Sequence, residues 1–466
     1  MKRMNFTKPK GRSFFLLLMI MGICNNFSCK EAKSKNMEEM VKVEIPAHPL
    51  RNAQDLDVLM ESIGDARVVL LGESSHGTSE YYTWRAAISK RLIEEKGFDF
   101  IAVEGEWADS YRINNLIKGE KKDNSQVVEQ LRSYDRWPTW MWGNYEVASL
   151  VTWLNTYNQS KGAADKVGFF GLDVYCLWES LTELNPYLQD KDPQLQKAAE
   201  RSYNCFKPYS ANPEEYASAV ARASADCHKE TEQLWNAINK MNEGKTAKTE
   251  ADFVMEQNAL VALNGEKYYT ASTEGGPASW NIRDQHMMQT LKRLLDFHGP
   301  TAKAIVWEHN THVGDARYTD MAGEGMVNVG QLVRQEYGNN NVFIVGLGSY
   351  EGSVIAASSW GGAITNMNVP PAQEGSWESM LHKIDGADKI VISSEIKGKE
   401  LQNKRIGHRA IGVVYNPAYE QYGNYVPTVI PKRYDAFLFI DRTKALTPLN
   451  TPVRTNEPPD LFPSGL

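Results

Sequence analysis

The sequence of 466 residues lacks a long apolar run. The longest, Phe14–Cys24, has eleven residues, whereas a helix that crosses a membrane needs about 20. Five basic residues and no acidic one surround it within residues 1–28, which is typical of a secretory signal peptide. The small residue Ser28 before Cys29 favours a bacterial lipoprotein that is lipidated at Cys29; release as a soluble protein is the alternative. We therefore expect a cell-envelope protein that contacts the membrane only through a lipid anchor.

Positive charge is scarce outside this leader. After residue 28 the chain has 46 Lys and Arg residues against 58 Asp and Glu residues. A protein that binds nucleic acid needs a basic face to neutralise phosphates. The charge balance therefore argues against a nucleic-acid partner.

Cysteine is also scarce, with five in the whole chain. Apart from Cys24 in the leader and the lipidation candidate Cys29, three remain, Cys176, Cys205 and Cys227, so they cannot all pair within one chain. A disulfide between Cys205 and Cys227 in an oxidising compartment and a set of unpaired buried thiols are both open.

Several motifs that would identify an enzyme class are missing. Gly72-Glu-Ser-Ser-His76 lacks the last glycine of a Gly-x-Ser-x-Gly elbow, which argues against a serine hydrolase of that fold. The sequence has no His-Glu-x-x-His zinc motif, and its nearest matches to a phosphate loop and a dinucleotide fingerprint each lack a required glycine.

Short apolar runs alternate with helical patterns, which indicates an α/β fold with a mostly parallel sheet flanked by helices. Helices are expected at Ser79–Lys96, which ends before Gly97, within Ser125–Tyr157 and at Asn328–Tyr337. The expected strands are Arg67–Leu71, Phe98–Val103, Val167–Gly171, Ala304–Trp307, Val342–Gly346, Ile411–Tyr415 and Ala436–Ile440.

The pattern between about residues 177 and 299 is different, being polar and rich in Ala, Glu, Lys and Gln. It predicts helices at Asp192–Tyr209, Pro213–Asn242 and Ala247–Ala271, in a helical insertion packed over the sheet. The predicted organisation is a signal peptide at 1–28, a flexible tether at 29–44, an α/β domain at 45–447 and an extended tail at 448–466.

Four predicted strands end in residues that carry chemistry. In an open parallel sheet, ligands bind beyond the carboxyl ends of the strands, so these side chains should meet in one cleft. They are Glu73, His76, Glu104, Asp173, His309 and His312. A histidine beside carboxylates can serve as a general base for water, and the same side chains could hold a divalent metal. Hydrolysis with and without metal is therefore open.

Four segments, in this order and spacing, resemble the erythromycin esterase family from about Asp55 to Thr443. They are Gly72–Gly77 with Glu104 after the next strand, Trp280–Met287, His309–His312, and Arg409–Tyr415 followed by Phe437 and Asp441. The resemblance implies an α/β fold with an inserted helical region, and hydrolysis of an ester such as a macrolide lactone.

The resemblance also implies roles for individual residues. His76 would be the general base that activates water, and Glu73 and Glu104 would orient it. Arg85 would stabilise the oxyanion. His309 and His312 would position the substrate or protonate the leaving alkoxide. No cofactor is required on this interpretation, although a divalent metal stays open.

Other side chains are candidates for contacting the substrate, a small-molecule ester or lactone. Asp173, Asn281, Arg283 and Asp284 are four of them, and the last three could instead cap and brace a helix. The aromatic run Tyr134–Trp142 could wall a pocket, with Trp140 as the candidate contact, or pack in the core.

Two other functions use the same residues. A metal-dependent hydrolase would take His76, Glu73, His309 and His312 as ligands. A non-catalytic envelope lipoprotein that binds haem or another ligand is an analogy of fold, and the pair Glu73 and Glu104 argues against it.

Overall fold

The computed structural model describes residues 44–188, 192–209, 212–245 and 248–449. The predicted signal peptide, the lipidation site Cys29 and nearly all of the predicted tether and tail lie outside these residues. Among the helices that are described, none is both long enough and apolar enough to cross a membrane.

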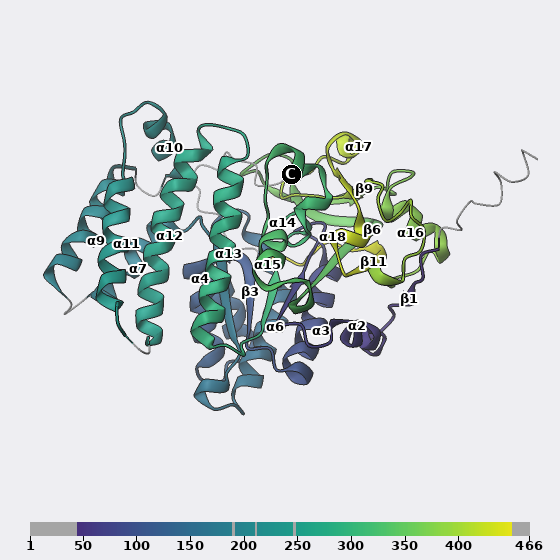
Figure 1. The fold of residues 1–466 in the computed structure, drawn as a ribbon, viewed down its shortest axis with the longest axis horizontal. Coiled ribbons are helices and arrows are strands. Elements are labelled where there is room, and N and C mark those ends of the chain that lie inside the picture. The colour runs from purple at the N-terminus through teal and green to yellow at the C-terminus, as the bar shows by residue number, and fades with distance from the viewer. Residues whose placement is uncertain (1–43, 189–191, 210–211, 246–247, 450–466) are drawn as a thin grey trace, which may run out of the picture. The chain divides into compact units, whose positions relative to one another are not determined.

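A central sheet of nine strands organises the described part of the chain (Figure 1). Its order is β1-β8-β11-β6-β2-β5-β3-β4, and β7 pairs with β6. From β11 to β4 all neighbours are parallel, whereas β1, β7 and β8 pair antiparallel. The strands are β1 (His48–Pro49), β2 (Val68–Leu71), β3 (Phe100–Glu106), β4 (Gly168–Asp173), β5 (Ala304–Trp307), β6 (Val342–Ala357), β7 (Ile364–Val369), β8 (Lys389–Ile392) and β11 (Ala436–Thr443). The predicted mostly parallel sheet is confirmed.

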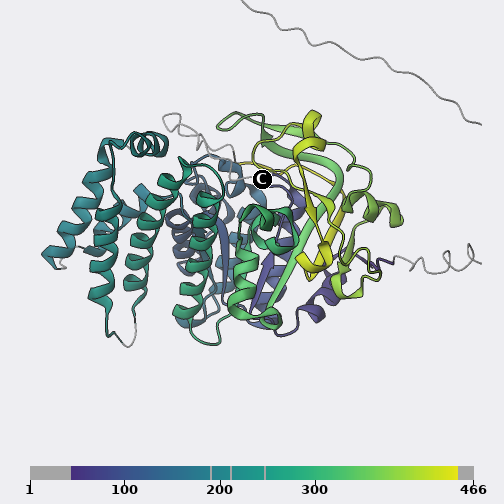
Figure 2. The same ribbon diagram turned by 45° about the horizontal axis from the view of Figure 1, so that its top comes forward.

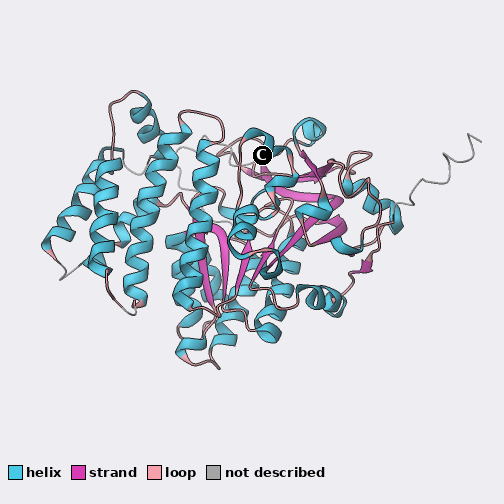
Figure 3. Cartoon of the chain, in the orientation of Figure 1, coloured by secondary structure: helices cyan, strands magenta, loops and turns pink. Residues whose placement is uncertain are grey.

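Helices cover both faces of the sheet (Figure 3), and the strands are apolar for that reason. In β2, Val69 and Leu71 join one core while Val68 and Leu70 join the other. Because successive side chains of a strand point to opposite faces, a strand buried on both faces needs a continuous apolar run.

Two groups of helices form these layers. One core contains residues of α2 (Asp57–Ile63), α3 (Ser79–Lys96), α5 (Asn124–Leu131) and α6 (Tyr145–Asn158). The other contains residues of α13 (Ala278–His298), α15 (Val329–Tyr337) and α16 (Trp377–Asp385), and α4 (Trp107–Lys118) contributes to both. The remaining short helices are α14 (Asn310–Val313), α17 (Glu420–Gly423) and α18 (Ile430–Arg433). The predicted helices at Ser79–Lys96 and Asn328–Tyr337 are confirmed, and Gly97 ends α3 with φ 66°.

The segment between β4 and β5 is helical, as predicted, but its placement differs from the prediction. Here α13 contacts β4, and α12 adds Phe253, Val254 and Val261 to the core on the same face of the sheet, whereas α11 and α9 continue the row away from β4 (Figures 1 and 2). This row buries its own apolar core, which includes Leu195, Phe206, Tyr216 and Leu234. The helices are α7 (Leu177–Glu183), α8 (Asn185–Leu188), α9 (Pro193–Phe206), α10 (Pro213–Ala221), α11 (His228–Asn242) and α12 (Glu250–Ser272).

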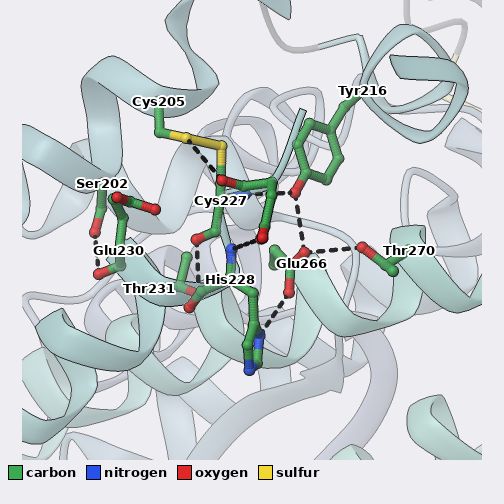
Figure 4. The surroundings of a disulfide bond; sticks show 10 residues. Ser202, Cys205, Tyr216, Cys227, His228, Glu230, Thr231, Glu266 and Thr270 are labelled. Atoms are coloured by element: carbon green, nitrogen blue, oxygen red, sulfur yellow. Dashed lines mark hydrogen bonds and ion pairs between the residues drawn. A yellow bond between two sulfur atoms is a disulfide. The ribbon is translucent and has the colours of Figure 1, made fainter. Parts of the chain in front are cut away.

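A disulfide joins Cys205 and Cys227. Of the two alternatives, the structure therefore has the disulfide and not the unpaired thiols. The disulfide links the end of α9 to the start of α11, beside the hydroxyl of Tyr216, which donates to Glu266 on α12 at 2.9 Å (Figure 4). Cys176 is buried and unpaired.

Three local predictions were wrong. Ile411–Tyr415 is no strand: it makes single bridges to Ser75 and Ala357 because it crosses the ends of two different strands. The small sheet nearby pairs β9 (Ile406–Arg409) with β10 (Tyr425–Thr428). A single helix over Pro213–Asn242 is broken between α10 and α11, where Ala223 has φ 53°. The region Ser125–Tyr157 holds two helices rather than one, separated by a loop that contains Pro138, which has no N–H to donate.

Candidate active site

The carboxyl ends of β2, β5, β3 and β4, which are successive neighbours in the sheet, meet at one edge. The predicted convergence of polar side chains at this edge is present, and all of them are buried. They are Glu73 and His76 after β2, Glu104 in β3, Asp173 in β4, and His309 and His312 after β5. Arg283 and Asp284 reach the same edge from α13.

His76 is held by a carboxylate. Its Nδ1 lies 2.9 Å from Oε1 of Glu73, and Arg85 donates to Oε2 of Glu73 at 2.7 Å. Because Nδ1 is engaged, Nε2 is the nitrogen that can take a proton from water. Burial lowers the pKa of His76, but its hydrogen bond to Glu73 and the charge of Glu104 outweigh it and leave that pKa above 6.5.

Arg85 lies behind this pair rather than in front of it. Its side chain is fully buried, and its guanidinium stacks at 4.4 Å from the ring centroid of Tyr82 and 4.6 Å from that of Trp307. The oxyanion role predicted for Arg85 is therefore corrected to one of holding Glu73.

Arg283 is the centre of the charged cluster. It donates through Nε and Nη2 to both oxygens of Asp173 at 2.9 and 2.7 Å, and through Nη2 to Glu104 at 2.8 Å. Its Nη1 lies 2.9 Å from Nε2 of His312. Burial raises the pKa of Glu104, but the neighbouring positive charges, among them Arg283, outweigh it and hold that pKa far below 4.5. Glu104 is therefore ionised.

His312 positions Arg283 and lies away from the open part of the site. An arginine N–H only donates, so Nε2 of His312 accepts and Nδ1 carries a proton toward Asp284, 3.0 Å away. The ring also stacks on Trp280, with centroids 4.5 Å apart. The predicted contact of His312 with substrate is therefore corrected to a supporting role.

His309 stands beside His76, with ring centroids 4.9 Å apart. Its backbone N–H donates to Glu104 at 2.8 Å, and its Nδ1 lies 2.8 Å from the hydroxyl of Thr311. Burial, and then the nearby charge of His76, hold the pKa of His309 well below 6.5. An uncharged ring of this kind does not deliver a proton at neutral pH.

Among the predicted metal ligands, Glu73 pairs with His76, whereas His312 accepts from Arg283. In the described ranges, no group of three or more His, Cys, Asp or Glu side chains is placed to hold a metal ion. Asp173, Glu104 and His312 would make a plausible donor set, but the guanidinium occupies the point on which they converge.

A cavity opens in front of His76. Its walls are partly aromatic, and Trp137 and Trp360 lie against each other with ring centroids 4.6 Å apart. It is lined by His76, Glu104, Glu106, Tyr134, Arg136, Trp137, Pro138, Met141, Trp142, Asp173, Tyr175, Arg283, Trp360 and Val413.

Three predicted substrate contacts do not reach this cavity. Trp140 is fully buried in the core, and its neighbours Trp137 and Trp142 form the wall instead. Asn281 braces a loop, since it bonds the backbone of Gly325 and Val327. Asp284 is fully buried and accepts from the backbone N–H of Val329 at 3.0 Å. These hydrogen bonds hold His312 and the start of α15, and Asp284 is not among the residues that line the cavity.

Several lining residues were missed by sequence reasoning. Glu106 follows Glu104 by two positions at a strand end, so the alternation of a strand would have placed it on the same side. Arg136 lies within the aromatic run that was singled out. Trp360 and Val413 come from distant loops, for which the sequence holds no local signal.

Glu308 is a buried carboxyl group, and neither of its oxygens has a hydrogen-bond partner among the described residues. Burial, and then the charges of Glu104 and Asp284, raise the pKa of Glu308 well above its ordinary 4.5. At a pH above 4.5, the folded chain therefore keeps the proton of Glu308, whereas the unfolded chain loses it. Stability is lost progressively as the pH rises from the unfolded pKa toward the folded one.

We expect Glu308→Gln to remove this pH dependence. Relative to the parent, its free energy of unfolding should increase by up to about 1.4 kcal/mol per pH unit above pH 5. Urea unfolding of both proteins at pH 5, 6.5 and 8 measures the difference. A constant difference across this range would contradict a protonated Glu308.

The sequence model described as Erythromycin esterase matches residues 93–443. The matched segment begins after Gly72–Gly77, so the assignment does not depend on His76. Erythromycin esterase type II of Escherichia coli is 23% identical over 358 residues, which cover 72% of this chain and 82% of that protein.

A second relative, YbfO of Bacillus subtilis (strain 168), is described provisionally as a hydrolase. It is 21% identical over 454 residues, which cover 91% of this chain and 96% of that protein. Among solved structures, a mutant of the erythromycin esterase EreC in its open conformation superposes with a TM-score of 0.62 at 14% identity, covering 84% of this chain and 95% of the other. That likeness concerns the fold.

Proposed function

Because the chain belongs to the erythromycin esterase family, we propose that it is a carboxylic ester hydrolase that opens a macrolide lactone or a related ester. Membership of this family supports a hydrolase activity. The identity of the ester that is hydrolysed and the roles of the catalytic residues are our proposal. The observation that carries it is His76 on the wall of a closed-in aromatic cavity, with Nδ1 fixed by Glu73.

In the proposed reaction, Nε2 of His76 takes a proton from a water molecule. The water oxygen attacks the carbonyl carbon, and negative charge develops on the carbonyl oxygen. Glu73 accepts a hydrogen bond from the imidazolium, and Arg85 holds Glu73 in place. Collapse of the intermediate breaks the bond to the alcohol oxygen.

Arg283 has the donor that the developing oxyanion needs. A guanidinium has five N–H groups, and four are directed at Asp173, Glu104 and His312. One N–H on Nη1 is left, and Arg283 lines the cavity. A positioned donor of this kind is worth about 10²–10³ in rate.

The cavity favours an ester with a bulky apolar part. Trp137, Trp142 and Trp360 offer flat apolar surface, and charged groups are gathered at the His76 end. A macrolide and other large lactones or esters share this chemistry.

We propose that the reaction needs no metal, because Arg283 supplies the positive charge where Asp173 and Glu104 meet. A metal-dependent hydrolase is the alternative. For location, we propose export and lipidation at Cys29; the disulfide between Cys205 and Cys227 supports an oxidising compartment.

The test is the mass of the product after the full-length protein is incubated with erythromycin, before and after exhaustive chelation. We expect a product one water heavier in both samples. Loss of turnover on chelation that added Zn²⁺ restores would overturn the metal-free mechanism. No product from erythromycin, with turnover of other bulky esters, would move the substrate away from macrolides.

A further inference from the structure

Glu106 lies on the cavity wall but has no part in the mechanism described so far. It lies two residues after Glu104 in β3, and both carboxyl groups line the same cavity as His76. Its side chain is 14% exposed, and its nearest charged neighbour is Nε of Arg136 at 3.7 Å. This distance is too long for a hydrogen bond.

The reaction needs a proton at the point where the alcohol leaves, because an alkoxide is a poor leaving group. The polar groups on the cavity wall can be compared for this task. Arg136 and Arg283 stay protonated at any working pH. Glu104 is ionised, and Asp173 is engaged at both oxygens by Arg283. Tyr134 is hydrogen-bonded to Ser110 at 2.9 Å.

We propose that Glu106 is the general acid of this hydrolase and protonates the leaving alcohol oxygen. The proposal rests on the proposed ester hydrolysis. His76 accepts one proton from water, and the water oxygen bonds to the carbonyl carbon. As the carbon–oxygen bond to the alcohol breaks, the Glu106 carboxyl proton moves to the alcohol oxygen. The products are an acid and an alcohol, and solvent returns the proton from His76 to Glu106.

The surroundings of Glu106 keep it protonated. Burial raises the pKa of Glu106 to about 8; Arg136 opposes this shift, while Asp109 on α4 and Asp173 on β4 add to it. Arg136 is itself shared with Glu179 on α7, at 2.9 Å, and Asp109 with Arg112. At neutral pH the carboxyl group is therefore mostly in the acid form, which is the form that a general acid needs.

The test compares two esters of one bulky acid, an ethyl ester and a p-nitrophenyl ester. The p-nitrophenolate can leave without being protonated, whereas the ethoxide needs a proton in order to leave. Glu106→Gln should lower kcat/KM for the ethyl ester about 10²-fold or more and leave the p-nitrophenyl ester nearly unchanged. The matched control Glu351→Gln also neutralises a partly exposed carboxylate paired with an arginine, Arg442, but Glu351 is not among the residues that line the cavity, so both esters should be unchanged.

An equal loss on both esters would overturn the role of Glu106. It would favour His76 as the group that both accepts the proton from water and protonates the leaving alcohol oxygen. The unmodified protein gives an independent readout. Its rate on the ethyl ester should fall as the pH rises through about 8, whereas the p-nitrophenyl rate should not. The same alkaline limb with both esters would also overturn the proposal.

The two failures are distinguishable. If the unmodified protein turns over neither ester nor any other of the panel, the proposed function fails and this role fails with it. If it turns over both esters and His76→Asn abolishes both, but Glu106→Gln affects them equally, only the role of Glu106 fails.

Discussion

His76→Asn should lower kcat/KM for ester hydrolysis by about 10³-fold, with little change in stability. Proton transfer by a positioned base contributes about 10²–10⁴-fold, and the amide of asparagine fills much of the ring's space without accepting a proton from water. Glu73 keeps its partner Arg85 at 2.7 Å, so no buried charge is left alone. The measurement is initial rate against ester concentration, with the unfolding midpoint in urea as the check on folding.

His382→Asn is the matched control for this substitution. His382 also pairs with a carboxylate, since its Nδ1 lies 2.6 Å from Asp441, but it is not among the residues that line the cavity. Its replacement should leave kcat/KM unchanged. If both variants lost activity equally, the loss would reflect general damage and His76 would have no special role.

The pH profile of the unmodified protein tests the same assignment. The base must be neutral to act, and the hydrogen bond and charges around His76 raise its pKa above 6.5. Activity should therefore be lost as the pH falls through a value above 6.5. An acidic limb well below 6.5 would contradict His76 as the base in this environment.

The sheet and the convergence of side chains at its edge could be predicted because both follow from local patterns. A strand such as β2 that is buried on both faces is apolar throughout, and its end is marked by the polar turn that contains Glu73 and His76. Once the strands are parallel and adjacent, their carboxyl ends must meet.

The partners of these side chains could not be predicted in the same way. Arg283 comes from α13, 110 residues after Asp173, and nothing local marks it as the centre of the cluster. The aromatic loop failed differently. Trp140 and Trp142 are two residues apart, but a short turn at Thr139–Met141 rotates Trp140 into the core and leaves Trp142 on the cavity wall. A loop has no fixed period from which such directions follow.

The roles of Arg85 and His312 depend on how far each side chain lies behind the cavity wall, which no sequence pattern indicates. A position nine residues after His76, on the next helix, is compatible with a side chain in front of Glu73 or behind it. The rings of Tyr82 and Trp307 place Arg85 behind it. His312 is likewise held away from the cavity, between Asp284 and Trp280.

Arg283→Met should have the largest effect on stability, about 3–5 kcal/mol of unfolding free energy. Removing one partner of a buried ion pair leaves the other charges uncompensated in a medium that solvates them poorly. Asp173 would lose both of its hydrogen bonds from Arg283, and Glu104 would lose its only guanidinium partner. Arg283→Lys would keep the charge but lose the forked geometry. Its free energy of unfolding should lie between those of the unmodified protein and Arg283→Met.

The pH dependence of this loss identifies its cause. Without Arg283, the pKa of Glu104 should rise above its unfolded value, so the folded state takes up a proton as the pH falls. The stability deficit should therefore shrink between pH 7 and pH 5, because protonation removes the uncompensated charge. Urea unfolding at these two pH values measures it.

Arg317→Met is the control that separates burial from pairing. Arg317 also binds a buried carboxylate, Asp315, at 2.9 Å from Nε, but it is 41% exposed and Asp315 keeps a second partner in Arg334. Its loss should cost no more than about 1 kcal/mol and should depend little on pH. If the two arginine variants were equally stable, the cluster around Arg283 would be no more than an ordinary set of ion pairs. The stability difference thus measures how strongly the fold depends on an internal cation at its proposed catalytic centre.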